Sequence, residues 1–209
     1  MIYEFERETM VRDQIMARGV TDPRVLDAML AVPRECFVPE AEHGLAHEDH
    51  PLPIGHGQTI SQPYVVALMT ELLDLPESAS VLEIGAGSGY QTAILAHISR
   101  HVCAIERDPD LADRARRVLE DLGFGNVELV AGDGFEGWPD PDLRFDGILV
   151  ACAPDHVPGK LAEALKPGAR MVLPVGPPDG TQMLTVVTRQ ADGSLVREAH
   201  SAVRFVPML

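Results

Sequence analysis

The stretch Val81-Leu82-Glu83-Ile84-Gly85-Ala86-Gly87-Ser88-Gly89 decides the fold of this 209-residue chain. Its first four residues predict a buried β-strand, and its alternating glycines predict a tight turn into a helix that continues to Ile98. Ligands of an open parallel sheet bind beyond the carboxyl ends of the strands, where a glycine-rich turn lets the backbone approach them. The turn also leaves free N–H groups at the start of the next helix. The stretch therefore predicts an α/β fold with a ligand site at the glycine loop.

Strand and helix patterns alternate through the C-terminal two thirds of the chain. The predicted strands cover residues 81–84, 102–105, 127–130, 148–151 and 171–175. Helices are predicted after Asp108-Pro109 and over roughly 155–165, and residues 183–188 and 196–206 alternate as an antiparallel hairpin around Asp192-Gly193. This order predicts a mostly parallel twisted sheet with helices on both faces and antiparallel strands in its C-terminal part.

The N-terminal third has a different pattern. Apolar residues spaced among charges predict an amphipathic helix over residues 4–18, and a second helix begins at Thr21-Asp22-Pro23 and stops at Pro33. Residues 33–64 contain many Pro, Gly and His and show little periodicity, so we expect an ordered but irregular segment, which is a common place for a binding site. A further helix is predicted over residues 65–75.

The composition excludes several classes of protein. The formal net charge is -15, with 32 acidic against 17 basic residues, which argues against a nucleic acid or an anionic membrane as partner. The same charge does not steer an acidic substrate, so such a substrate must be held locally. We expect no signal peptide, because the first six residues are too acidic, and no run of membrane-spanning length. The sequence therefore predicts a soluble cytoplasmic protein.

Cysteine and histidine spacing predicts neither disulfides nor a metal site. The three cysteines are widely spaced and form no C-x-x-C pair. Four histidines gather loosely in the irregular segment in a spacing that fits no usual ligand pattern: His43, His47, His50 and His56.

The residues around the glycine loop separate two kinds of nucleotide ligand. A dinucleotide fingerprint requires a third glycine where this chain has Tyr90. Glu83, two residues before Gly85, would repel a pyrophosphate but suits the ammonium of a methionine moiety. The loop is therefore more typical of S-adenosylmethionine binding.

Two more acids follow the next two strands. Glu106 ends the second strand, 21 residues after Gly85, where a carboxylate can accept hydrogen bonds from both ribose hydroxyls. Asp133, in Gly132-Asp133-Gly134, follows the third strand and can accept a hydrogen bond from the adenine amino group. One such acid alone would be an ordinary solvated carboxylate. Three acids after three successive strands favour S-adenosylmethionine as the cofactor.

The methyl acceptor has to be inferred from other residues. The fourth strand runs into Ala151-Cys152-Ala153-Pro154-Asp155, which lacks the Asn/Asp-Pro-Pro-Tyr motif typical of base-amine methylation. A carboxylate acceptor, already ionised with a pKa near ~4, requires only hydrogen-bond donors. Residues 52–64 supply hydroxyls, an amide and backbone N–H groups. Ser61 in this segment is equally well explained as the N-cap of a helix that starts near Pro63.

Motifs along nearly the whole chain resemble the protein-L-isoaspartate (D-aspartate) O-methyltransferase family. They are Met10-Val11, Arg18-Gly19-Val20, Pro33-Arg34-x-x-Phe37-Val38-Pro39, Pro53-Ile54-Gly55, Gln58-Thr59-Ile60-Ser61-Gln62-Pro63-Tyr64, Val81-Leu82-Glu83-Ile84-Gly85, Gly87-Ser88-Gly89-Tyr90-Gln91-Thr92-Ala93, Asp133-Gly134 with Gly137-Trp138, Phe145-Asp146, Leu173-Pro174-Val175-Gly176 and Arg204-Phe205-Val206-Pro207. The segment from Gln58 to Tyr64 is highly specific, whereas many methyltransferases share the glycine loop.

The resemblance implies an activity and a set of roles. The enzyme would transfer a methyl group to the free α-carboxylate of L-isoaspartyl residues in damaged proteins and peptides. The ester would collapse to a succinimide, whose hydrolysis returns some normal aspartate. Ser61 would be the active-site residue. The residues implied or inferred to hold S-adenosylmethionine are Gln58, Thr59, Ile60, Glu83, Gly85, Gly87, Glu106, Asp133 and Gly134.

These expectations define one methyltransferase domain over residues 1–209 with a Rossmann-like class I fold. A helical N-terminal extension and substrate loop (1–64) would precede a cofactor-binding α/β core (65–209), and we expect a monomer, with a dimer as the alternative. A methyltransferase for a small-molecule acceptor and a non-catalytic cofactor-binding module remain alternatives. Ala86 stands where many relatives have a hydroxyl residue, so one cofactor hydrogen bond would be missing. Arg204 is open to two interpretations, a buried structural arginine or a substrate clamp.

Overall fold

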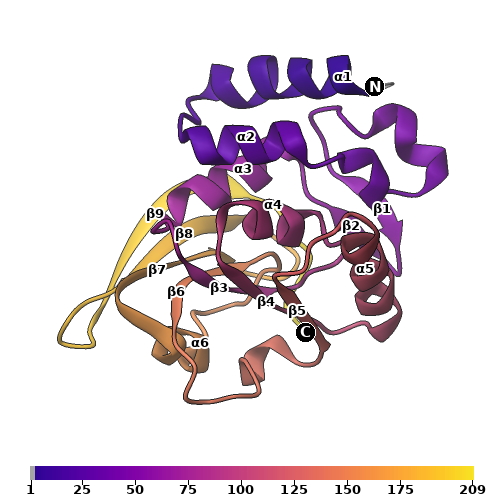
Figure 1. The fold of residues 1–209 in the computed structure, drawn as a ribbon. Coiled ribbons are helices and arrows are strands. Elements are labelled where there is room, and N and C mark those ends of the chain that lie inside the picture. Colours follow the sequence, from indigo (N-terminus) through magenta and orange to yellow (C-terminus); the bar gives the residue numbers. More distant parts are fainter. Residues whose placement is uncertain (1–2) are drawn as a thin grey trace.

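The computed structural model describes residues 3–209, so Met1 and Ile2 of the acidic N-terminal stretch lie outside it. Its main feature is a seven-stranded sheet of order β5-β4-β3-β6-β7-β8-β9 (Figure 1). The strands are β3 (Ser80–Ile84), β4 (His101–Glu106), β5 (Val127–Ala131), β6 (Phe145–Val150), β7 (Leu165–Val175), β8 (Gln182–Arg189) and β9 (Leu195–Val203). The strands from β5 to β7 pair in parallel, and β8 and β9 pair antiparallel, as the sequence predicts.

The strand order reverses between β3 and β6. From β3 the chain moves outward through β4 to β5, and it then returns to place β6 on the other side of β3. Such a reversal leaves a crevice beyond the carboxyl ends of the two central strands, where open α/β sheets bind ligands. The glycine loop leaves β3 at this point, so the topology places the predicted ligand site in the crevice.

Helices cover both faces of the sheet, as predicted. The helices are α1 (Glu4–Thr9), α2 (Pro23–Ala31), α3 (Pro63–Leu72), α4 (Tyr90–Ile98), α5 (Pro109–Asp121) and α6 (Gly159–Ala164). Val81 faces the core that contains α2 to α5, whereas Leu82 and Ile84 face the core that contains Leu161 of α6. The alternation along β3 explains its burial on both sides. Figure 1 shows α1 and α2 stacked beyond α3 and α4, with α6 on the opposite face.

Local chain signals account for several element boundaries. The Asp22 side chain caps α2 by accepting from the Arg24 N–H, and the Asp108 side chain caps α5 in the same way. The segment predicted as one helix over 4–18 is helical throughout, but it passes from α1 into a π-helical turn (Met10–Ile15) and a 3-10 turn (Met16–Arg18). The helix predicted over 155–165 is only the short α6, because Leu165 already begins β7.

The segment 33–64 contains more regular structure than the sequence indicates. Two 3-10 helices, Arg34–Phe37 and Glu40–Leu45, precede an antiparallel pair of strands, β1 (Leu52–Gly55) and β2 (Gln58–Ile60). The segment is ordered, as expected, but the expectation that it is irregular is wrong for these helices and strands. The strands are too short to show a clear period, and their turn uses His56 and Gly57, both with positive φ, in place of the usual Asn-Gly or Asp-Gly signal.

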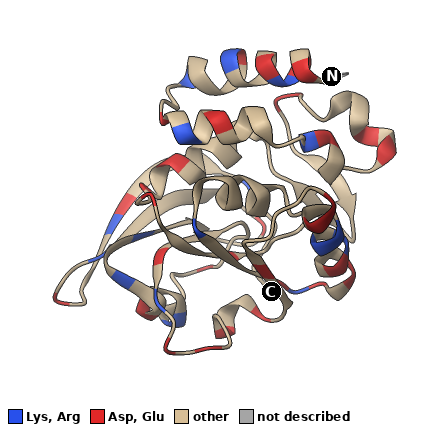
Figure 2. Cartoon of the chain, in the orientation of Figure 1, with Lys and Arg blue, Asp and Glu red and all other residues tan. Residues whose placement is uncertain are grey.

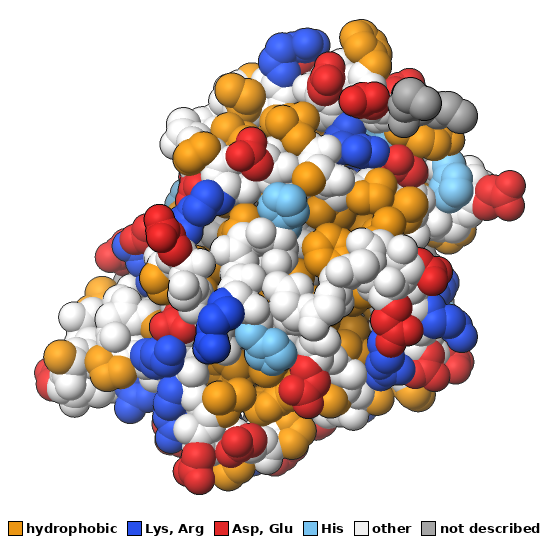
Figure 3. Space-filling view, in the orientation of Figure 1, with side chains coloured by type: hydrophobic (Ala, Val, Ile, Leu, Met, Phe, Trp, Pro, Cys, Tyr) orange, Lys and Arg blue, Asp and Glu red, His pale blue; other side chains and the backbone are white. Residues whose placement is uncertain are grey.

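The surface carries mixed charge. Acidic and basic residues are interspersed along α1, α2 and α5 (Figure 2), and Figure 3 shows several Lys and Arg side chains close together at the lower left, with acidic side chains beside them. Within residues 3–209, every helix is too short or too polar to cross a bilayer.

Candidate active site

The glycine loop between β3 and α4 has a backbone that requires glycine. Gly87 and Gly89 have φ values of 55° and 88°, in the left-handed region that side chains rarely adopt. A Cβ on Gly89 would also lie 3.1 Å from the Cβ of Ala115 on α5. The loop therefore turns sharply while α5 packs against it, which keeps the loop backbone at the crevice.

Three adjoining hollows line the carboxyl ends of β3, β4 and β6. All three share Thr59 and Ala151, so they form one continuous depression. The first, which we call the cofactor cleft, is lined by Gln58, Thr59, Ile84, Gly85, Gly87, Ile105, Glu106, Arg107, Gly132, Gly134, Ala151, Cys152 and residues 206–209. The second, beneath the glycine loop, adds Ile60 and Ser61. Of the ten predicted site residues, only Glu83 and Asp133 lie off these walls.

Glu106 lies at the end of β4 with its carboxylate on the cleft wall. One oxygen accepts from the Gly87 N–H at 2.7 Å and the other from the Asp108 N–H at 2.9 Å. These bonds fix the carboxylate against the glycine loop. A carboxylate oxygen has a second lone pair, so both can still accept from the two hydroxyls of a ribose. The geometry suits the predicted ribose contact.

Glu83 lies behind the cleft wall, on the face of β3 that α4 covers. The residue is 0 % exposed, and neither carboxylate oxygen has a hydrogen-bond partner among residues 3–209. Burial raises the pKa of Glu83 to about 8; the Thr92 hydroxyl opposes this shift, and the charge of Glu106 adds to it. An unpartnered buried carboxylate beside the glycine loop suits a cationic ligand group. A direct contact with the cofactor ammonium remains a prediction, because Glu83 is not on the wall.

Asp133 does not line the cleft, although its neighbours do. Its exposed side chain accepts from the Phe135 N–H at 2.9 Å and caps the 3-10 turn Gly134–Glu136. Gly134 lies on the wall, where an added Cβ would be 2.3 Å from Cγ2 of Ile84. The hydrogen bond from Asp133 to adenine remains a prediction, and the structure places the backbone of this turn nearer the cleft than its carboxylate.

The C-terminal residues form a cleft wall that sequence reasoning missed. The Ala153 N–H donates to Val206 O, and the Met208 N–H donates to Ala153 O, both at 2.8 Å. This bridge holds residues 206–209 beside the carboxyl ends of the strands, and the C-terminus lies beside β4 and β5 in Figure 1. The only sequence signal was the Arg204-Phe205-Val206-Pro207 motif of the resemblance.

Ser61 lies between β2 and α3 and faces the depression. Gln62, not Ser61, occupies the N-cap position of α3, and its side chain makes no capping bond. The interpretation of Ser61 as a helix cap is therefore wrong. Within residues 3–209 its hydroxyl makes no hydrogen bond, while its carbonyl accepts from the Arg34 guanidinium at 2.8 Å. The hydroxyl is available for a ligand.

Arg34 is a buried residue that the predicted site did not include. It is 0 % exposed, donates to the carbonyl of Ala46 at 2.7 Å as well as to that of Ser61, and lies 4.8 Å from the ring centre of Tyr90. Burial without a carboxylate partner lowers its pKa to about 10. Arg34 thus ties the Ser61 backbone to the first residue of α4, directly after the glycine loop.

The third hollow, which we call the acceptor groove, opens beside Ser61 and has a volume of about 590 Å³. Its walls come from residues far apart in the chain: Arg18, Pro51, Thr59, Ser61, Gln62, Tyr64, Val65, Leu68, Ala151, Thr181 and residues 201–206. The volume lies within the range of small-ligand pockets, and the lining combines apolar side chains with a few polar groups.

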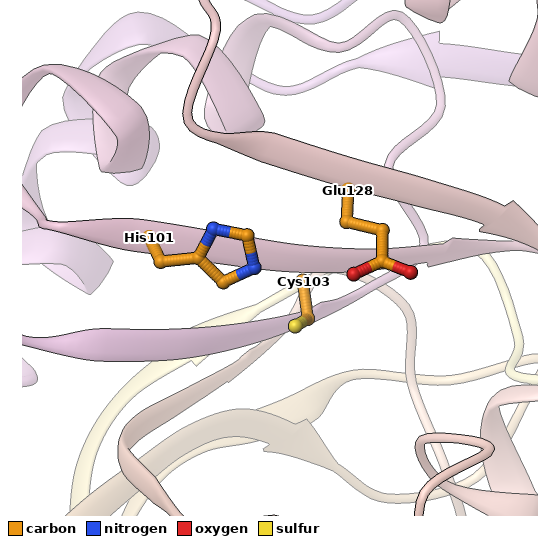
Figure 4. Close-up of side chains that lie close together, drawn as sticks. All are labelled: His101, Cys103 and Glu128. Carbon is orange, nitrogen blue, oxygen red and sulfur yellow. The ribbon is translucent and has the colours of Figure 1, made fainter.

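A separate group of possible metal ligands lies at the start of β4. His101, Cys103 and Glu128 place their ligand atoms within 4.8 Å of one another (Figure 4). The group supplies three ligand atoms, whereas a structural zinc site has four. We assign no metal to this group, and the absence of a metal site remains a prediction.

The strand order and the cleft at its reversal define the class. A glycine loop after the first parallel strand, a carboxylate on the second and an antiparallel C-terminal pair are the architecture of a Rossmann-like class I methyltransferase. Comparison with known proteins agrees. A solved structure titled protein-L-isoaspartate O-methyltransferase superposes with a TM-score of 0.87 at 30% identity over 96% of this chain and 65% of that one. A putative protein-L-isoaspartate O-methyltransferase from Plasmodium falciparum, in complex with S-adenosyl-L-homocysteine, shares the fold with a TM-score of 0.84 at 24% identity, over 97% of this chain and 98% of that one.

Sequence comparison gives the family. The family model for protein-L-isoaspartate(D-aspartate) O-methyltransferase matches residues 5–209, and the chain belongs to this family. It is 53% identical to protein-L-isoaspartate O-methyltransferase 2 of Anaeromyxobacter sp. (strain Fw109-5), over 98% of this chain and 84% of that protein. It is 50% identical to the protein-L-isoaspartate O-methyltransferase of Geobacter metallireducens, over 100% of this chain and 96% of that protein.

Proposed function

We propose that the protein transfers the methyl group of S-adenosylmethionine to the free α-carboxylate of L-isoaspartyl residues in damaged proteins and peptides. The observation that carries the proposal is the acceptor groove, which meets the cofactor cleft at Thr59 and Ala151 and presents the unengaged hydroxyl of Ser61. The membership of the family supports the choice of acceptor.

The residues of the chain bind and orient the cofactor and the acceptor carboxylate. The methyl transfer requires no general base. S-adenosylmethionine supplies an activated methyl group on a sulfonium when it is bound. Glu106 and the glycine-loop backbone hold the nucleoside end, and Ser61 donates a hydrogen bond to one oxygen of the acceptor carboxylate. The acceptor is already ionised near neutral pH, so positioning provides most of the rate enhancement.

The product accounts for repair. The methyl ester carries a better leaving group than the carboxylate. The backbone amide nitrogen that follows the isoaspartyl residue in the peptide attacks the ester carbonyl, methanol leaves, and a succinimide forms. Water opens this ring at either carbonyl, which returns part of the material to normal aspartate.

The decisive experiment compares an isoaspartyl peptide with its aspartyl twin, using radiolabelled S-adenosylmethionine. We expect labelling of the isoaspartyl peptide alone. Equal labelling of both, or labelling of a metabolite pool without the isoaspartyl peptide, would overturn the proposal. Ser61→Ala should lower kcat while the dissociation constant for S-adenosylhomocysteine stays nearly the same, and Ser194→Ala, which changes a hairpin turn outside the depression, is the control.

The proposal extends to the oligomeric state, compartment and partners of the enzyme. We infer a monomer in the cytoplasm that acts on isoaspartyl proteins and has no nucleic-acid partner, since the net charge of -15 disfavours polyanions. Size-exclusion chromatography with light scattering tests the monomer.

A further inference from the structure

Arg204 is an unpaired cation on the wall of the acceptor groove. It follows the last residue of β9, it is exposed, and it forms no hydrogen bond or ion pair with any other residue of the described range 3–209. The interpretation of Arg204 as a buried structural arginine is therefore wrong. Its side chain is free to meet a ligand in the groove that contains Ser61.

The backbone on both sides of Arg204 is held in place. Val203 pairs with Gln182 of β8, and the Phe205 N–H donates to the side-chain oxygen of the buried Gln182 at 2.9 Å. The carbonyl of Val206 is bonded to Ala153. Because these bonds fix the chain around Arg204, a ligand has to order only the side chain, which lowers the entropic cost of binding.

The other cation of the groove is already engaged. Arg18 forms an ion pair with Asp49, and its guanidinium lies 4.7 Å from the ring centre of Tyr64. Among residues 3–209, Arg18 and Arg204 are the only charged residues on the groove wall. After Arg18 is neutralised by Asp49, the groove retains the single positive charge of Arg204 in a chain whose net charge is -15.

We propose that Arg204 forms a subsite for the carboxylate of an aspartyl or glutamyl side chain adjacent to the isoaspartyl residue, so that the enzyme favours acidic substrate segments. The proposal rests on the proposed function. A guanidinium binds carboxylates by paired charge-assisted hydrogen bonds. It does not suit the reacting carboxylate, because such pairing would stabilise that ion before the reaction and occupy its nucleophilic oxygens. A neighbouring carboxylate has no such conflict.

A local cation has a clear purpose in this protein. The overall field of an acidic chain repels an acidic peptide, so long-range steering does not help such a substrate to bind. One guanidinium within the groove offsets this repulsion at the place where the peptide lies. The interaction is exposed, so it should be modest in size and should weaken as salt is added.

The test uses three isoaspartyl peptides that differ only in the residue after the isoaspartyl position, which is Glu, Gln or Lys. For the unmodified enzyme at low salt we expect kcat/KM to be about three- to fivefold higher for the Glu peptide than for the Gln peptide, with the Lys peptide lowest. The Arg204→Gln variant should bring the Glu-to-Gln ratio to about one. Because the ratio is taken within one variant, a general loss of activity cancels.

Two further variants make the assignment specific. Arg117→Gln removes an exposed arginine of α5 outside the groove, and it should keep the selectivity ratio of the unmodified enzyme. The double variant Arg18→Gln with Asp49→Asn should also keep it, because it removes both partners of the ion pair and leaves the net charge unchanged. If the enzyme methylates the Gln peptide but shows no preference for Glu, or if this double variant abolishes the preference and Arg204→Gln does not, the subsite is refuted while the proposed function stands. If no isoaspartyl peptide is methylated, both fail.

Discussion

The protonation of Glu83 should make the stability of the ligand-free enzyme depend on pH. Burial raises the pKa of this carboxyl from 4.5 to about 8. Between these values the folded protein holds a proton that the unfolded chain has released, so the free energy of unfolding falls as pH rises, by about 1.4 kcal/mol per pH unit. The stabilising contribution is complete below pH 4.5 and is lost as the pH passes about 8. At pH 7 this titration makes the free energy of unfolding about 3 kcal/mol smaller than it is below pH 4.5. That loss is a large share of the stability of a typical domain.

The variant Glu83→Gln removes this dependence, because its amide is neutral at every pH and has nearly the same shape. The free energy of unfolding is measured by urea denaturation between pH 5 and pH 8 in the absence of cofactor. As the pH rises across this range, the free energy of unfolding of Glu83→Gln should increase relative to that of the unmodified protein by roughly 3–4 kcal/mol. The exposed Glu198→Gln is the control and should show a constant difference. A difference that is constant for Glu83→Gln as well would refute the reasoning.

Three further predictions concern the site and its support. Glu106→Gln should weaken S-adenosylhomocysteine binding about 10- to 100-fold, as measured by calorimetry. The reason is that one backbone N–H and the ribose lose a charged acceptor. An unchanged dissociation constant would contradict the ribose assignment. Arg34→Met should lower the free energy of unfolding by about 2–4 kcal/mol and the Tm by roughly 5–15 °C, because the partly buried carbonyl of Ser61 and the carbonyl of Ala46 both lose their donor. It should also lower kcat, and an unchanged Tm would contradict the prediction. Gly134→Ala should lower the free energy of unfolding by about 1–3 kcal/mol, because its Cβ would meet Cγ2 of Ile84. Ile84→Ala removes that methyl group, so the double variant should lose less stability than the sum of the two single variants, and strictly additive losses would exclude this contact.

Much of the cofactor half of the site could be predicted from local patterns. A glycine that needs positive φ and a carboxylate that ends a strand are signals contained within a few residues, and the sheet brings successive strand ends together at one edge. Glu106 and the glycine loop therefore lie where the spacing indicates. Glu83 and Asp133 show the limit of this reasoning, because spacing gives the end of a strand but not the direction of a side chain.

The acceptor half depended on contacts between distant parts of the chain. Arg18, Ser61 and Arg204 share one groove only because the tertiary fold brings α3 and the end of β9 to its walls. Nothing within the short β1–β2 hairpin signals its pairing, since its strands have too few residues to show a period.

The sequence by itself determined the α/β class, the glycine loop and the nature of the cofactor, because those depend on backbone conformation and on charge near one strand end. Only the tertiary structure decided which arginine is buried and which is free. Arg34 lies in the core against Tyr90, while Arg204 remains exposed on the groove wall. Burial and pairing depend on what the rest of the chain packs against a residue, and that information is absent from its neighbours in sequence.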